Sequence, residues 1–152
     1  MTENNDTLDY QTSVLINADK RDVFTALTSQ LDEWWGTTDQ PYEKVGDIFK
    51  ISFGGESYWK FKVVEISASH ILWKCVESNQ DHNLQGIDEE WLGTLLQWKI
   101  EEVNRGTELK FKHQGLVPQG VCYGVCSTAW DFYITDSLKN YLEDGKGKPS
   151  EK

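Results

Sequence analysis

A chain of 152 residues, of which 38 % are hydrophobic and 26 % charged, is long enough to bury one core. We expect a single domain over residues 1–152 with an ordered part at about 9–145. The formal net charge of −10 argues against nucleic acid and anionic membrane as partners, because both are bound through cationic surfaces. No apolar run reaches the ~18 residues of a membrane-spanning helix, and residues 1–20 lack the basic-then-apolar order of a signal peptide. We therefore expect a cytoplasmic protein without membrane insertion.

The first elements are one strand and two short helical segments. Alternating apolar and polar residues over 10–16 predict a half-buried strand. Asp19 is placed as the N-cap of a short helix over 20–29. Residues 30–36 predict a second, brief helical turn that carries two adjacent tryptophans.

The middle of the chain is rich in strand patterns. Period-two alternation, bounded by turn residues, predicts strands over residues 41–45, 47–53, 57–66, 70–76, 91–103 and 107–113. Gly54-Gly55 predicts a hairpin, and the polar residues 77–90 predict an exposed loop. Antiparallel strands joined in this way form a meander.

The spacing of the apolar residues changes after Pro118. Apolar residues then recur at steps of three and four, which predicts one long helix ending at Gly145. An antiparallel sheet with one apolar face has to cover that face, and this helix is the only element long enough to do so. The predicted fold class is α+β, a curved antiparallel sheet of six to seven strands with two short helices and a long C-terminal helix packed across it. A cavity is expected between helix and sheet, because strongly twisted sheets curl.

Three segments resemble a known superfamily, namely residues 13–36, residues 53–66 and the C-terminal residues 127–149. The last is the most specific, with Trp130, Phe132-Tyr133, Ser137-Leu138-Lys139 and then Leu-Glu-x-Gly-Lys-Gly-x-Pro over 142–149. The chain resembles the SRPBCC (START-like, birch-pollen-allergen-like) superfamily, in the branch named for activators of the heat-shock-protein-90 ATPase. The resemblance implies a helix-grip fold and a hydrophobic cavity of the kind that the superfamily uses for lipids, sterols, polyketides and hormones. Chaperone-activating relatives carry an additional N-terminal domain, and we do not expect one within these 152 residues.

Strand parity and helix phase give a set of candidate cavity-lining residues. Most ligand pockets of this kind are lined by aromatic side chains with a few polar groups. The alternative is that the same rings interlock as an ordinary core. The candidate ligand-binding residues are Trp34, Trp35, Phe53, Trp59, Phe61, Trp73, Leu96, Trp98, Phe111, His113, Cys126, Trp130 and Tyr133.

His113 is the one titratable ring among these candidates. It could anchor a ligand's polar head, or be a histidine whose hydrogen bonds are satisfied at the end of the sheet. Cys122 and Cys126 share a helix face, but a metal site would need two more ligands, of which only Cys75 and His113 could face them. We expect three free, reduced thiols, no metal and no cofactor.

Three functional hypotheses remain. The favoured one is a binding module for a small apolar or amphipathic molecule. The second is a cochaperone-like domain that binds the heat-shock-protein-90 chaperone. The third is a small cyclase- or hydrolase-like enzyme, whose acid or base candidates are Glu56, Glu65, His113 and Tyr133. No catalytic residue is assigned, since the sequence lacks a phosphate loop, a nucleophile elbow and metalloprotease spacing, and the oligomeric state is not predicted.

Overall fold

The computed structural model describes residues 9–52, 58–79, 92–116 and 123–148. The chain forms an α+β fold in which one sheet is covered on its inner side by helices. The elements, in chain order, are β1 (Tyr10–Ile16), α1 (Lys20–Thr28), the 3-10 turn η2 (Leu31–Glu33), β2 (Thr37–Thr38), β3 (Ile48–Ser52), β4 (Tyr58–Ile66), β5 (His70–Asn79), β6 (Leu95–Val103), β7 (Gly106–Gln114), α3 (Tyr123–Phe132), the π-helical η3 (Tyr133–Leu138) and α4 (Lys139–Asp144).

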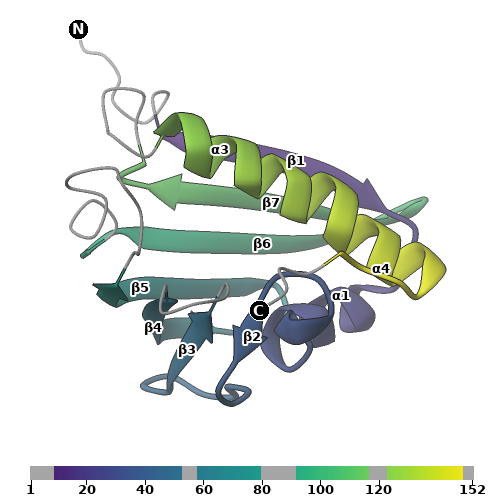
Figure 1. Ribbon diagram of the computed structural model, residues 1–152. Coiled ribbons are helices and arrows are strands. Elements are labelled where there is room, and N and C mark those ends of the chain that lie inside the picture. Colours follow the sequence, from purple (N-terminus) through teal and green to yellow (C-terminus); the bar gives the residue numbers. More distant parts are fainter. Residues whose placement is uncertain (1–8, 53–57, 80–91, 117–122, 149–152) are drawn as a thin grey trace, which may run out of the picture.

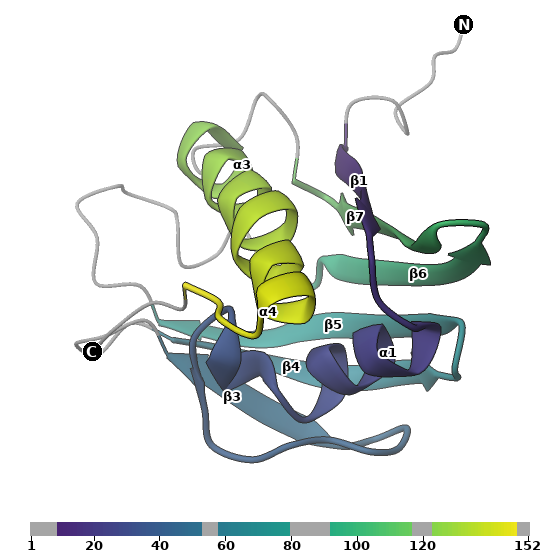
Figure 2. The same ribbon diagram turned by 90° about the vertical axis from the view of Figure 1, so that its right-hand side faces the viewer.

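The sheet is antiparallel throughout its described part, with seven strands in the order β1-β7-β6-β5-β4-β3-β2. It curls around the terminal helix, and α1 lies against one end of the same concave side (Figures 1 and 2). The predicted helix-grip α+β architecture is confirmed, because the long helix covers the apolar face of the sheet. None of the described helices is long and apolar enough to cross a membrane.

One predicted strand is wrong. Residues 41–45 form no strand; instead the two-residue β2 pairs with β3 just before them. The Asp47 carboxylate accepts hydrogen bonds from the backbone N–H groups of Glu43 and Lys44, at 2.9 and 3.2 Å. A side chain that binds its own local backbone in this way favours a turn over a strand ladder. The hydrogen bond from Glu43 also holds the pKa of Asp47 below its usual value.

The other expected elements occur, with altered ends. β5 continues to Asn79, so the predicted loop over residues 77–90 begins later, and β6 begins only at Leu95. Asp19 does occupy the N-cap of α1 but makes no side-chain capping hydrogen bond. Phe53, the Gly54-Gly55 hairpin and the start of the terminal helix lie outside the described residues.

The last carbonyl groups of α1 are satisfied by aromatic side chains. The Trp34 indole Nε1 donates to Ala26 O at 2.9 Å, and the Tyr42 hydroxyl donates to Leu27 O at 2.7 Å. Carbonyl groups in the last turn of a helix have no partner within the helix and are costly to bury unpaired. These two bonds therefore allow the end of α1 to be buried in the aromatic interior.

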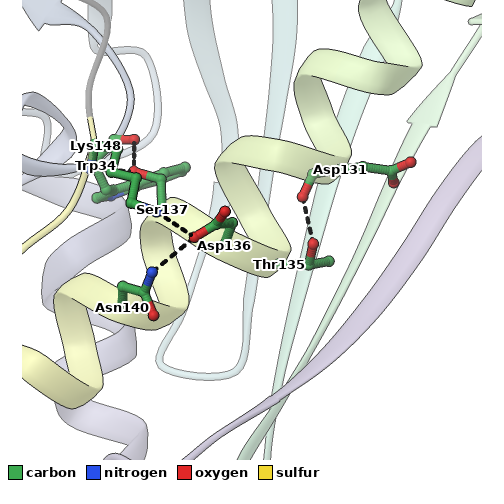
Figure 3. A network of polar contacts seen from close by, with 7 residues as sticks. All are labelled: Trp34, Asp131, Thr135, Asp136, Ser137, Asn140 and Lys148. Atoms are coloured by element: carbon green, nitrogen blue, oxygen red, sulfur yellow. Dashed lines mark hydrogen bonds and ion pairs between the residues drawn. The ribbon is translucent and has the colours of Figure 1, made fainter.

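The terminal helix contains a π-helical segment and ends where Gly145 adopts φ +83°. The chain then returns towards η2, and Ser137 of the π segment holds it there (Figure 3). The buried Ser137 hydroxyl donates to Trp34 O and accepts from Lys148 N, both at 2.7 Å. Beside it, the Asp136 carboxylate accepts hydrogen bonds from Asn140 and Lys148. One serine thus joins three separate segments.

Candidate functional site

The interior between helix and sheet is filled by stacked aromatic rings. Trp35 lies at its centre, stacked on Trp73 with a centroid distance of 5.8 Å and an interplanar angle of 8°, and stacked on Trp34 at 5.9 Å. On the helix side, Trp130 approaches Trp35 to 5.1 Å. Each of these indoles is at most 2 % exposed. They come from the segment directly after η2, from β5 and from α3, so the aromatic cluster joins separate parts of the fold.

A second group of rings continues the cluster towards β7. Trp98 lies 4.3 Å from Phe111 and 5.3 Å from Trp73, and it meets Trp130 edge-on. The Trp98 indole is fully buried, and its Nε1 has no hydrogen-bond partner among the described residues. A buried donor without an acceptor costs about 1–3 kcal/mol, and such groups often mark the place of a water molecule or a ligand.

His113 forms the polar end of this interior. Trp130 Nε1 donates to His113 Nδ1 at 3.2 Å, and His113 Nε2 lies 2.9 Å from Thr94 Oγ1. Since an indole N–H can only donate, Nδ1 is the acceptor and the ring proton sits on Nε2, which donates to Thr94. Burial lowers the pKa of His113 to about 3, so the ring is neutral at physiological pH.

Most of the predicted site residues lie in the buried interior. Phe53 lies outside the described part of the chain, and Tyr133 is half-buried on the helix. Leu96 is buried directly opposite His113, in register across β6 and β7. The remaining candidates join one buried cluster: Trp34, Trp35, Trp59, Phe61, Trp73, Trp98, Phe111, His113, Cys126 and Trp130. Core packing thus accounts for their contacts, and a role in ligand binding stays a prediction.

Two polar residues of this interior, Tyr42 and Thr94, were not predicted from the sequence. Tyr42 is 2 % exposed and stacked on Phe49 at 4.7 Å, and burial raises the pKa of its hydroxyl. Thr94, half-buried before β6, is the partner of His113. The helical position of Trp130 was a signal for the His113 contact, whereas nothing in the spacing of Thr94 pointed to it.

The acid and base candidates are not gathered at one place. Glu65 lies on the outer face of β4, where it accepts a 2.9 Å contact from His70, whereas His113 lies on the inner face. A substrate on one face cannot reach both. Glu56 lies outside the described residues. Both ring nitrogens of His113 are engaged, with Trp130 and Thr94, and burial lowers its pKa, which disfavours it as a general base at neutral pH.

The expectation of free thiols is wrong for Cys126. Cys75 is a free, buried thiol, and burial raises its pKa to about 12. Cys126 is disulfide-bonded, and its partner lies outside the described residues. The sequence leaves Cys122, four positions earlier in the chain, as the remaining cysteine. The prediction of free thiols rested on the absence of an export signal, and the shared helix face of Cys122 and Cys126 was considered only as part of a metal site.

A family model described as "Activator of Hsp90 ATPase homolog 1-like protein" matches residues 17–143. The chain belongs to this family. No curated protein matches the chain. Among solved structures, this chain is similar to the Aha1 dimer from Colwellia psychrerythraea. The two share 26 % sequence identity with a TM-score of 0.76, and the match covers 92 % of this chain and 99 % of that one.

Two further structures share the fold of this family member. A Chromobacterium violaceum protein matches with a TM-score of 0.72 and 14 % identity over 90 % of this chain and 98 % of that one. A Staphylococcus saprophyticus protein matches with a TM-score of 0.71 and 16 % identity over 93 % and 96 %. At such identities the likeness concerns the fold alone.

Proposed function

We propose that this domain binds a small, largely apolar molecule that carries a hydrogen-bond acceptor, between the terminal helix and the inner face of the sheet. The observation that carries the proposal is the Trp98 Nε1–H group, which is fully buried and has no acceptor within residues 9–52, 58–79, 92–116 and 123–148. A ligand carbonyl or ether oxygen would relieve that cost, and the surrounding rings would cover its apolar body.

The polar end of the interior supports the same proposal. Trp130, His113 and Thr94 form a chain of hydrogen bonds that runs from the aromatic cluster to a half-buried hydroxyl. A neutral histidine held in one tautomer offers fixed donor and acceptor positions without a charge. This arrangement favours a neutral ligand over a carboxylate or an amine, since nothing in it would compensate a buried charge.

Matched probes test the proposal. Fluorenone and fluorene have the same ring skeleton, and only fluorenone carries a carbonyl acceptor. We expect fluorenone to raise the melting temperature and quench the tryptophan fluorescence, with an affinity about tenfold above that of fluorene, the effect of one hydrogen bond of about 1.4 kcal/mol. Native mass spectrometry with lipid and polyketide libraries then extends the comparison.

The probe experiment has a clear contrary outcome. If neither probe shifts the melting temperature or the fluorescence, and a crystal structure shows only packed side chains or an ordered water at Trp98 Nε1, the proposal is wrong. Equal affinity for both probes would show that Trp98 Nε1 does not donate a hydrogen bond to the ligand.

A second candidate function is an interaction with the chaperone Hsp90. It is supported by the family match over residues 17–143 and by the 26 % identity to the Colwellia Aha1. We expect the purified chain to be retained by immobilised Hsp90 and to change its ATPase rate. Absence of both effects would rule the candidate out.

A further inference from the structure

The outer face of the sheet carries a concentration of lysines that the proposed function does not use. Strand alternation points the apolar residues of β3–β7 inward and places lysines on the opposite side. We call this surface the lysine face; its members are Lys50, Lys60, Lys62, Lys74, Lys99, Lys110 and Lys112. These seven come from only 15 basic residues in a chain of net charge −10. Positive charge is therefore gathered on one surface of an acidic protein.

Lysines on this face stand directly opposite one another. Lys62 pairs in register with Lys74 across β4 and β5, and Lys99 with Lys110 across β6 and β7. Like charges that face each other in this way destabilise a sheet. Within the described residues, Lys62, Lys74 and Lys99 have no ion-pair partner. The arrangement is unfavourable for the isolated domain.

The face is not uniform, and one end is already neutralised. Lys60 forms an ion pair with Glu77 at 3.6 Å, and Lys50 lies over the Tyr58 ring. At the other end Lys110 only reaches Glu101 and Glu108 at 3.9 and 4.0 Å, with both partners of the first pair more than half exposed. On β7, Lys112 also lies 4.0 Å from the Asp9 carboxylate. On β6, Lys99 has no ion-pair partner among the described residues, so the unpaired lysines form a row across β4, β5 and β6: Lys62, Lys74 and Lys99.

A groove lies beside Lys99, at one end of this row. It encloses about 560 Å³ on the outer side of β1, β7 and β6, and combines lysines with amide and hydroxyl side chains; its lining is Gln11, Thr12, Ser13, Gln97, Lys99, Lys110, Phe111 and Lys112. Ammonium, amide and hydroxyl groups are all donors to carboxylate oxygens. The described helices lie on the concave side of the sheet, so none of them covers the groove (Figure 2).

We propose that this groove docks an acidic segment of another protein. An extended polyanion, such as duplex DNA or an anionic bilayer, would also meet the acidic remainder of the molecule and be repelled by it. A short carboxylate-rich segment can lie within the groove, where Lys99 and Lys110 stand opposite one another in register. A second copy of this chain would bring its own lysine face and a net charge of −10, which disfavours a symmetric contact.

Two single substitutions with equal charge change test the proposal. Lys99→Glu removes a groove lysine, and Lys44→Glu changes an exposed lysine in the turn before β3. The probe is a fluorescein-labelled peptide of alternating glutamate and glycine, measured by anisotropy. We expect Lys99→Glu to weaken binding about tenfold and Lys44→Glu less than about twofold, with the wild-type affinity falling as NaCl rises.

The melting temperature distinguishes a role of Lys99 in binding from a role in stabilising the fold. In Lys99→Glu the new carboxylate faces Lys110, so the melting temperature should not fall even though peptide binding is weakened. The proposal fails if the wild type does not bind the peptide, or if both variants weaken binding equally. It also fails if duplex oligonucleotide or phosphatidylserine vesicles bind more tightly than the peptide. Self-association that Lys99→Glu abolishes would instead assign the face to a contact between copies.

Discussion

His113 shows how one buried residue ties stability to pH. Its ring has an ordinary pKa of 6.5 and a folded-state pKa of about 3 because of burial. Between these values the unfolded chain binds a proton that the folded chain does not, so stability is lost as pH falls from 6.5 towards 3. Between pH 7.5 and 5 we expect a loss of about 2 kcal/mol, at about 1.4 kcal/mol per pH unit below 6.5.

Urea unfolding at several pH values measures this loss. The pH range is suitable because the pKa values of Asp47, Glu77 and Glu143 are lowered, so their protonation affects stability only at lower pH. His113→Gln should be less stable at pH 7.5 but lack most of the slope. Ring chemical shifts of His113 in the wild type give an independent readout, and a titration midpoint near 6.5 would contradict its burial as a neutral ring.

At the scale of elements, Ser137 links the π-helical segment to the chain after it. Ser137→Ala leaves Trp34 O and Lys148 N without their shared partner, and buried groups left unpaired cost about 1–3 kcal/mol. We expect a loss in that range by urea unfolding. Thr135→Ala is the control, since the exposed Thr135 hydroxyl donates to Asp131 O within its own helix. A comparable loss there would refute a special role for Ser137.

Gly145 and Gly147, at the end of the terminal helix and just after it, are needed for different reasons. Gly145 has a left-handed backbone conformation, and Gly147 closely approaches another segment. A Cβ on Gly147 would lie 2.3 Å from Glu33 O and 3.0 Å from Trp34 Cα, so Gly147→Ala must displace the returning chain. Gly145 has φ +83° and open space around it, so Gly145→Ala costs only the strain of a left-handed residue, about 1 kcal/mol. Gly147→Ala should cost more and raise amide exchange at Lys148, and equal costs for the two variants would count against this contact.

Strand parity was the part of the fold that the sequence predicted best. The alternation around Phe61, Trp73 and Trp98 puts these rings inward, and all three are buried. The strand over residues 41–45 failed because the Asp47 carboxylate satisfies local backbone groups, a competition that periodicity does not register. The Thr94 contact to His113 could not be predicted, since it depends on how the chain folds back before β6.

At the scale of the whole molecule, the two faces of the sheet have opposite chemistry. Within the described residues the inner face is mostly aromatic and aliphatic, with His113 and Thr107 as its buried polar side chains on β7, whereas the lysine face lies on the outer side. Because successive strand residues point to opposite sides, a single run such as Lys60-Phe61-Lys62 contributes side chains to both faces of the sheet. The two binding proposals therefore use separate surfaces, and either one can fail without the other.

Charge reversal on the lysine face should change stability in opposite directions at neighbouring positions. Lys62 faces Lys74 with no carboxylate partner in the described part, so Lys62→Glu creates an opposite-charge pair and should stabilise the domain by about 0.2–1 kcal/mol. Lys60 already pairs with Glu77, so Lys60→Glu places two carboxylates together and should destabilise it by a similar amount. Both variants change the net charge equally, so thermal unfolding at low salt separates local pairing from overall charge. Added salt should shrink both effects, and a common shift of the two variants in one direction would mean that net charge, not cross-strand register, governs stability at this face.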